Sequence, residues 1–313
     1  NKAILSDKVI KSQGRTMLGK IKRLIVRMSL RLMDAIEYEY YSVFSDNGFF
    51  KKEIQGSLMY LKTDDPGISK ELLLTGVHEE RTTEMVKREL KTGMKIIEVG
   101  ANIGYYSLLE ASIIGETGKV FAIEPVVENY DLLKSNIKLN NSGNIIPYNF
   151  AISDKAGKGD FFLTDESNWG SMVDPESDFI SPSMTKKLQK RHNEKITVET
   201  KTLDDFIEDE GIDEVNLIRM DIEGYEIQAL NGMKKTLESS QNLRLLIEVH
   251  NKIFTDPKES LGPTFDMLID FGYKPKVLLA KKDEHYDIDP EKFTSLITSY
   301  KDICCHLLME KVN

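Results

Sequence analysis

The sequence predicts an α/β protein: a doubly wound, mostly parallel sheet of seven strands with a helical N-terminal extension. From Lys95 onward, short apolar segments alternate with longer segments of helical periodicity. Several short segments are apolar almost throughout, among them KVFAI, VNLIRM and LRLLIEV, which is typical of strands covered by helices on both faces. These two observations together indicate a doubly wound sheet.

The same pattern predicts the individual elements. Strands are expected at residues 95–99, 119–124, 144–149, 215–220, 243–249, 274–280 and 303–309. Helices are expected at residues 79–90, 103–113, 126–140, 225–238 and 261–271. Residues 155–202 form a polar insertion between the third and fourth strands, with short strands at DFFLT and KITVETKT. Such an insertion lies next to the carboxyl edge of the sheet, where open sheets bind their ligands.

Residues 1–78 are expected to form a helical extension or cap, and residues 79–313 the main domain. Within the extension, residues 17–33 have a helical pattern, with an apolar face beside a basic flank. The apolar face consists of Met17, Ile21, Leu24, Ile25, Met28 and Leu32. The basic flank consists of Lys20, Arg23, Arg27 and Arg31. Two interpretations stay open: the helix packs on the body, or it lies on a membrane surface that carries anionic lipid. Residues 37–76 are aromatic and irregular, and we expect them to form a lid.

Charge and cysteine content limit the partners and the compartment. Residues 1–33 hold nine basic residues and one acid, whereas the remaining 280 residues hold 33 basic and 50 acidic residues. The main body would therefore repel a polyanion, which argues against nucleic-acid binding. The adjacent Cys304 and Cys305 support no disulfide framework, and no apolar stretch approaches the roughly 18 residues of a membrane span. A cytoplasmic location is expected, with peripheral membrane contact through residues 17–33 as the alternative.

The segment KIIEVGANIGYYSLL, residues 95–109, has the strand–turn–helix outline of a nucleotide-binding loop. Gly100 and Gly104 permit a tight turn, but Asn102 stands where a dinucleotide-binding loop would have a second glycine. Glu98 adds a carboxylate at the end of the strand. Both features disfavour a diphosphate and favour a ligand with positive charge, such as an amino-acid ammonium beside a sulfonium.

A second acid supports a nucleoside ligand. Glu124 ends the second strand, 20 residues after Gly104, where a carboxylate can accept hydrogen bonds from both ribose hydroxyls. A nicotinamide-dependent oxidoreductase shares this early pattern and is the alternative enzyme class, although Asn102 and Glu98 count against it.

Six blocks of the sequence resemble FkbM-type methyltransferases, a branch of the S-adenosylmethionine-dependent class I fold, over about residues 79–250. They are IIEVGANIGYYSLL, GKVFAIEPVVENYDLLKSNIKLNN, AISDKAG, KTLDDFI, NLIRMDIEGYEIQALNGM and LLIEVH. The resemblance implies a seven-stranded, Rossmann-like sheet whose last two strands form an antiparallel hairpin. It also implies that the methionine part of S-adenosylmethionine lies among Glu98, Gly100, Ala101, Asn102 and Gly104, with the ribose at Glu124 and the adenine near Ala151. The family often has Asp where this chain has Glu98.

The acceptor is expected at the carboxyl ends of the fourth and fifth strands, next to the methyl group, where Asp221, Glu223, Glu248 and His250 fall. We expect His250 or Asp221 to be the general base, with Glu223 and Glu248 orienting the acceptor. Asp221 also borders the cofactor site. A metal is not expected, although Asp221, Glu248 and His250 could hold a divalent cation.

The insertion contains SNWGS, residues 167–171, with the only tryptophan. Trp169 is either a packing anchor or a flat surface for a sugar ring, with Asn168 and Ser171 adding hydrogen bonds. The predicted function is methylation of a hydroxyl oxygen on a sugar, glycolipid or secondary metabolite. The alternatives are the nicotinamide-dependent oxidoreductase and a non-catalytic cofactor-binding partner protein.

Overall fold

The computed structural model describes residues 17–312, and within that range it describes all side chains except those of residues 17–23 and 191–193. The predictions for the side chains of Met17, Lys20, Ile21 and Arg23 therefore lie outside the described part. The described helices include none that is both long and apolar enough to cross a bilayer.

The central sheet has eight strands in the order β12-β11-β13-β10-β9-β3-β4-β5. All neighbouring strands from β5 to β10 are parallel, whereas β13 is antiparallel to both β10 and β11. The strands are β3 (Lys95–Val99), β4 (Lys119–Ile123), β5 (Ile145–Tyr148), β9 (Leu217–Met220), β10 (Arg244–Val249), β11 (Tyr273–Ala280), β12 (Asp283–Tyr286) and β13 (Cys305–Lys311). The predicted α/β fold and all seven predicted strands are confirmed.

The eighth strand corrects the predicted count. β12 is a short edge strand of sequence DEHY, and it lacks the apolar alternation by which strands are recognised. Because β12 and helix α12 (Pro290–Ser299) both lie between β11 and β13, these two antiparallel strands are neighbours without forming a direct hairpin.

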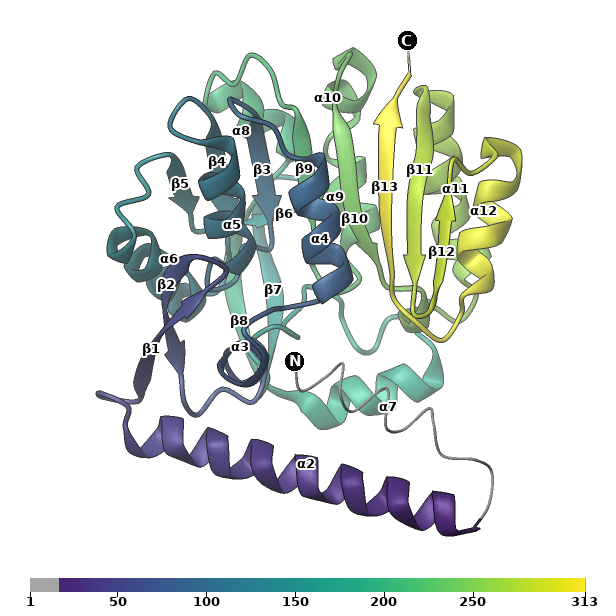
Figure 1. Cartoon of the computed structure of the whole chain (residues 1–313). Helices are drawn as coiled ribbons and strands as arrows, with labels where there is room; N and C mark the ends of the chain where they lie inside the picture. The colour runs from purple at the N-terminus through teal and green to yellow at the C-terminus, as the bar shows by residue number, and fades with distance from the viewer. Residues whose placement is uncertain (1–16, 313) are drawn as a thin grey trace.

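Helices cover both faces of the sheet (Figure 1). One face carries α3 (Ile68–Thr75), α4 (Glu80–Glu89), α5 (Tyr105–Ile114) and α6 (Val127–Leu139). The other carries α8 (Leu203–Asp209), α9 (Glu226–Asn231), α10 (Lys234–Ser239), α11 (Pro257–Asp270) and α12. Two buried hydrophobic clusters, one per face, therefore hold the strands in place.

The prediction of one helix over residues 225–238 is wrong, because α9 and α10 are separate. The break falls at Gly232, where a Cβ atom would lie 2.1 Å from the carbonyl oxygen of Ser153. The chain thus passes too close to a neighbouring backbone for any other residue. Helix α8 was not predicted from periodicity, although its start is marked by Thr202, whose side chain accepts a hydrogen bond from the backbone N–H of Asp205.

The insertion forms a separate three-stranded sheet in the order β6-β8-β7. Its strands are β6 (Ala151–Ile152), β7 (Gly157–Thr164) and β8 (His192–Lys201), and helix α7 (Pro182–Arg191) precedes β8. The two strands predicted in this segment are confirmed as β7 and β8.

The N-terminal segment consists of α2 (Met17–Val43), the hairpin β1 (Phe49–Ile54) and β2 (Ser57–Lys62), and α3. The hairpin is hydrogen bonded to α6: Asn136 Oδ1 accepts from Tyr60 N at 2.7 Å, and Asn140 Oδ1 accepts from Leu58 N at 2.8 Å. Apolar side chains of the hairpin and α3 belong to the same buried cluster as those of α4 and α5. This segment is thus packed onto the sheet domain.

Candidate active site

The loop after β3 lies at the switch point of the sheet. Strand β3 is flanked by β4 on one side and β9 on the other, and open α/β sheets bind ligands where the chain order reverses in this way. Gly100 begins the loop with φ 90°, and a Cβ on it would lie 2.1 Å from the carbonyl oxygen of Asp221. Only glycine fits this position. Ala101 is buried behind the loop, and Gly104 precedes the first residue of α5.

A cavity opens beside this loop, at the place where open α/β sheets bind their ligands. Its lining combines apolar and polar residues. The apolar ones include Phe150, Ala151, Ile152, Phe161 and Met172; the others include Gly100, Asn102, Glu124, Asn168, Asp221 and Glu223. Seven residues predicted to bind cofactor or acceptor thus line one cavity.

Glu124 is fixed in the wall of the cavity. Its Oε2 accepts a hydrogen bond from Asn102 N at 2.8 Å and its Oε1 accepts one from Val126 N at 2.9 Å. Burial raises the pKa of Glu124 to about 7, although these two backbone N–H groups act in the opposite direction. Each oxygen keeps a second lone pair that a ligand hydroxyl can use.

Glu98 does not lie where the sequence led us to expect. Its side chain is fully buried and is not part of the cavity lining. Its Oε1 pairs with Arg219 Nη1 of β9 at 2.5 Å, and the Arg219 guanidinium also stacks 3.6 Å from the ring centroid of Tyr106. Glu98 is on the sheet face covered by α5, because it alternates with Ile97 and Val99, which point to the other face. This carboxylate balances a buried arginine and faces no ligand.

Glu110 of α5 completes the buried group. It is fully buried, and neither of its carboxyl oxygens has a hydrogen-bond donor among the described residues. Burial, followed by the neighbouring charge of Glu98, raises the pKa of Glu110 well above its ordinary value. A proton on Glu110 supplies the missing donor toward Glu98, so we interpret Glu110 as a neutral acid.

We expect the Glu110→Gln variant to gain stability relative to wild type as pH rises. The folded protein keeps a proton on Glu110 that the unfolded chain releases above pH 4.5, its ordinary pKa. Wild-type stability therefore falls with pH, by up to about 1.4 kcal/mol per pH unit, until the folded pKa is reached. Glutamine has no proton to lose but still donates to Glu98. Urea unfolding of both proteins at several pH values around neutrality measures the difference in their free energies of unfolding. If the two free energies change with pH in parallel, Glu110 is ionised in the folded protein.

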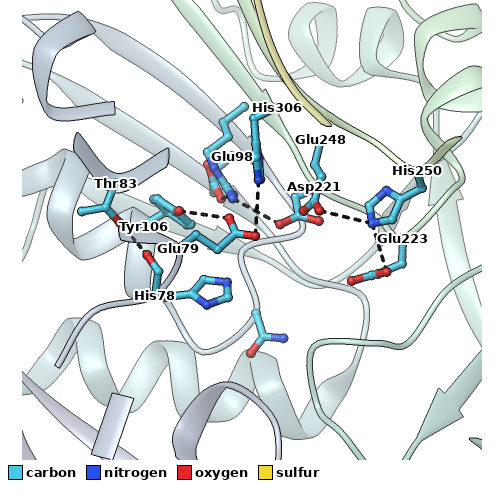
Figure 2. A network of polar contacts seen from close by, with 12 residues as sticks. His78, Glu79, Thr83, Glu98, Tyr106, Asp221, Glu223, Glu248, His250 and His306 are labelled. Carbon is cyan, nitrogen blue, oxygen red and sulfur yellow. Dashed lines mark hydrogen bonds and ion pairs between the residues drawn. The ribbon is translucent and has the colours of Figure 1, made fainter. Parts of the chain in front are cut away.

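The four predicted catalytic residues lie together (Figure 2). His250, directly after β10, is 1% exposed; its Nε2 lies 3.0 Å from Glu223 Oε2 and 3.7 Å from Glu248 Oε1. Asp221 lies beside this group in Figure 2, and it also pairs with Arg219 at 3.2 Å. Because Asp221 and Glu223 line the cavity and His250 does not, Glu223 connects the cavity to the histidine.

Glu226 holds the other side of the imidazole ring. Its Oε1 lies 2.9 Å from His250 Nδ1 and also accepts a hydrogen bond from Gly224 N. Glu226 is 3% exposed, so this contact is shielded from water. A carboxylate on Nδ1 fixes the orientation of the ring and directs Nε2 toward Glu223.

The pKa directions separate the two candidate bases. Burial opposes ionisation of Asp221, yet Arg219 and His250 lower its pKa to about 2. Burial lowers the pKa of His250, but the negative groups around it, Cys304, Glu223, Glu226 and Glu248, raise it well above 6.5. Asp221 is therefore a weak proton acceptor and His250 a strong one.

Sequence reasoning missed a second polar group beside Asp221. Tyr106 donates a hydrogen bond to Glu79 Oε2 at 3.3 Å, and Glu79 Oε1 lies 3.5 Å from His306 Nε2 (Figure 2). The sequence did contain signals of buried charge in this region. Arg219 is the one charged residue in the strand LIRM, and Glu110 is the one charged residue in α5. A charge at a buried position calls for a partner, but sequence alone does not say which.

The SNWGS loop is placed beside the cavity, but its residues have different surroundings. Asn168 lines the cavity. Ser171 is buried, and its hydroxyl donates to the carbonyl oxygen of Glu223 at 2.8 Å, so it fixes the loop that carries Glu223. The Trp169 ring lies 4.4 Å from Lys252 Nζ and 4.6 Å from Lys187 Nζ. Neither Ser171 nor Trp169 is part of the cavity lining.

Three potential metal-ligand groups of the described residues overlap in this region. Asp221, Glu223 and His250 offer atoms within 4.8 Å of one another, and so do Glu248, His250 and Cys304, and Glu79, Glu248 and His306. The predicted combination of Asp221, Glu248 and His250 is not one of them. Both ring nitrogens of His250 already have carboxylate partners, so the contacts are accounted for by hydrogen bonds and ion pairs.

Comparison with known families identifies the core of the chain. The model of the methyltransferase FkbM domain matches residues 98–275, and that of protein-L-isoaspartate(D-aspartate) O-methyltransferase matches residues 16–156. The resemblance found in the sequence is confirmed.

Three curated relatives are methyltransferases. Hexuronic acid methyltransferase AglP of Haloferax volcanii is 25% identical over 181 residues, which cover 58% of this chain and 65% of that protein. Methyltransferase sdnD of Sordaria araneosa is 26% identical over 44% of this chain and 60% of its own. 2-O-methyltransferase NoeI of Sinorhizobium fredii is 31% identical over 30% of this chain and 40% of its own. The chain thus matches less than two thirds of the length of each.

Proposed function

Because the chain belongs to the FkbM methyltransferase family, we propose that it is an S-adenosylmethionine-dependent methyltransferase that methylates a hydroxyl oxygen of a sugar or another small, hydroxylated acceptor. The observation that carries the proposal is the cavity at the switch point, with Glu124 fixed in its wall and with Asp221 and Glu223 of the acid–histidine group in its lining.

The residues present fit the cofactor. The apolar lining residues Phe150, Ala151 and Phe161 suit a purine. Glu124 has lone pairs free for the ribose hydroxyls, and ionised Asp221 faces the part of the cavity where a cationic group would lie. In place of Glu98, Asp221 supplies the carboxylate that a cation needs.

When bound, S-adenosylmethionine supplies an activated methyl group on a sulfonium, and its transfer to a hydroxyl oxygen releases one proton. The chain's own residues then have two tasks, alignment of the hydroxyl and removal of its proton. Glu223 lines the cavity and can accept a hydrogen bond from the hydroxyl. Glu223 then passes the proton to His250 Nε2, which lies 3.0 Å from Glu223 Oε2 in a ring that Glu226 orients.

The acceptor class is supported by the relatives and by the loop beside the cavity. The names of two relatives specify a hexuronic acid and a 2-O position. Trp169 lies next to cavity-lining Asn168, and aromatic side chains with nearby polar groups commonly bind sugar rings. We therefore expect a hydroxylated ring as the acceptor.

Calorimetry with S-adenosylhomocysteine tests the cofactor assignment. The wild-type chain should bind, and Glu124→Ala should raise the Kd at least about tenfold, because buried hydrogen bonds to the ribose are lost. Glu128→Ala is the matched control: Glu128 is an exposed acid of α6 and should leave the Kd unchanged. Absence of binding, or equal Kd values for Glu124→Ala and wild type, would refute the proposal.

Two further measurements separate the alternatives. Tight binding of NADH in a fluorescence titration would favour the nicotinamide-dependent oxidoreductase. Transfer of a labelled methyl group from S-adenosylmethionine to a panel of glycosides, hexuronic acid glycosides included, separates an enzyme from a non-catalytic cofactor-binding protein. A chain that binds the cofactor but methylates no member of a broad acceptor panel would fit the non-catalytic alternative.

A further inference from the structure

Helix α2 exposes a continuous apolar stripe. Among the described residues, 14 large apolar side chains are exposed, and eight of them belong to α2: Leu24, Ile25, Met28, Leu32, Met33, Ile36, Tyr40 and Val43. Ile25, Met28, Leu32 and Ile36 follow one another at helical spacing, so they lie on one side of the helix. The exposed fractions of Met28, Leu32 and Ile36 are 61%, 63% and 63%. The expectation that this face packs on the body is wrong.

The opposite side of α2 is the one that contacts the body. The Tyr38 hydroxyl donates to the carbonyl oxygen of Asp65 at 3.2 Å, and the Tyr41 ring packs edge-on against Phe50 with 4.8 Å between centroids. Val26 and Leu30, on this side, are less exposed than the stripe. The apolar stripe consequently points away from the rest of the described residues and is exposed to water.

The charge beside the first half of the stripe is positive, whereas the second half of α2 contains the acids Asp34, Glu37 and Glu39. Residues 17–33 contain five basic residues and no acid, and of these Arg27 and Arg31 are described and exposed. By the spacing of a helix Arg31 borders the stripe beside Leu24, and Arg27 lies farther round the helix, toward the side of Tyr38. An outward apolar stripe with a basic flank has the charge and polarity of a helix that lies in the headgroup region of an anionic bilayer.

The position of α2 relates this surface to the active site. Strand β13 is antiparallel to β10, so the parallel strands end at the side of the sheet opposite the C-terminus, and α2 lies at that end (Figure 1). Asp65, which accepts from Tyr38, also accepts hydrogen bonds from Ser167 N and Oγ at 3.2 and 2.8 Å. Ser167 lines the cavity. The helix and the cavity are therefore linked through two residues.

We propose that α2 binds the surface of a membrane with anionic lipid headgroups, with its apolar stripe in the bilayer interface and its basic flank on the headgroups. The active-site end of the sheet then faces the membrane. If the proposed function holds, an acceptor linked to a lipid would reach the cavity from that surface.

Co-sedimentation of the full chain with vesicles tests this inference. The chain should bind vesicles that contain phosphatidylglycerol more strongly than pure phosphatidylcholine vesicles, and added salt should weaken the binding. A Leu24→Gln, Met28→Gln, Leu32→Gln variant should lose at least about tenfold in partitioning, because three apolar side chains no longer enter the interface. An Arg27→Gln, Arg31→Gln variant should lose about tenfold on anionic vesicles only.

A control variant with Val127→Gln and Tyr286→Gln removes two exposed apolar side chains elsewhere and should bind vesicles like wild type. Binding of S-adenosylhomocysteine should be the same in all variants, which shows that they are folded and tests the proposed function separately. No binding to anionic vesicles, or equal binding by the triple variant, would overturn the inference. The inference would also be overturned if the wild-type chain is a dimer, the triple variant is a monomer, and the wild-type chain does not bind vesicles.

Discussion

Replacing His250 with glutamine should lower kcat for methyl transfer by about 10²- to 10⁴-fold, the usual contribution of a general base. The Kd of S-adenosylhomocysteine should stay close to that of wild type, because His250 is not part of the cavity lining. Glutamine keeps a polar side chain of similar reach but cannot take a proton at neutral pH. The acceptor that gives the highest turnover in the glycoside panel is the substrate for this measurement. A variant with kcat near wild type would assign proton removal to another group.

The pH dependence tests the same assignment with a defined sign. Only the neutral imidazole can accept a proton, and the surrounding negative groups raise the pKa of His250 well above 6.5. We expect kcat to increase with pH through an alkaline-shifted pKa. Glu226→Gln removes one negative charge at 2.9 Å, so the increase should move to lower pH. NMR titration of the His250 ring in both proteins reports the same shift without any acceptor, and an unchanged pKa would rule out the positioning role of Glu226.

Much of the fold was predictable because its signals are local. The parallel strands are short apolar segments, and glycine or proline residues mark several of their ends, so periodicity located β3, β4 and β10 to within one or two residues. β12 was missed because an exposed edge strand has no apolar face to display. The break between α9 and α10 was missed because it depends on Ser153, which is distant in sequence.

The candidate site was predictable in part for the same reason. Residues at the carboxyl ends of neighbouring parallel strands must lie near one another, and this placed Asp221, Glu223, Glu248 and His250 together. The direction in which each side chain points was not predictable from motif position. Glu98 and Glu124 both come near strand ends, yet one faces Arg219 beneath α5 and the other faces the cavity. Pairing of buried charges is a long-range property, and Arg219 is 121 residues from Glu98.

Gly100→Ala should destabilise the protein by about 3 kcal/mol and raise the Kd of S-adenosylhomocysteine more than about tenfold. The added Cβ would lie 2.1 Å from the Asp221 carbonyl oxygen, a backbone atom that no rotamer change can move. The ends of β3 and β9 must therefore separate. Asp221 lines the cavity and pairs with Arg219. Its displacement therefore alters the cofactor site and the buried ion pair together.

The matched control is Gly56→Ala, which isolates the cost of backbone conformation from the cost of the contact. Gly56 has φ 85°, close to the 90° of Gly100, but a Cβ on it would meet nothing within 4 Å. The Gly56→Ala variant should lose only about 1 kcal/mol of unfolding free energy and should bind S-adenosylhomocysteine like wild type. Urea unfolding and calorimetry on both variants give the two differences. If the two variants lose the same unfolding free energy and have the same Kd, the close approach of Gly100 to Asp221 does not shape the site. Gly100 would then be needed only for the conformation of the turn. A loss confined to Gly100→Ala would show that the switch-point loop and the Asp221 strand end are built as one unit.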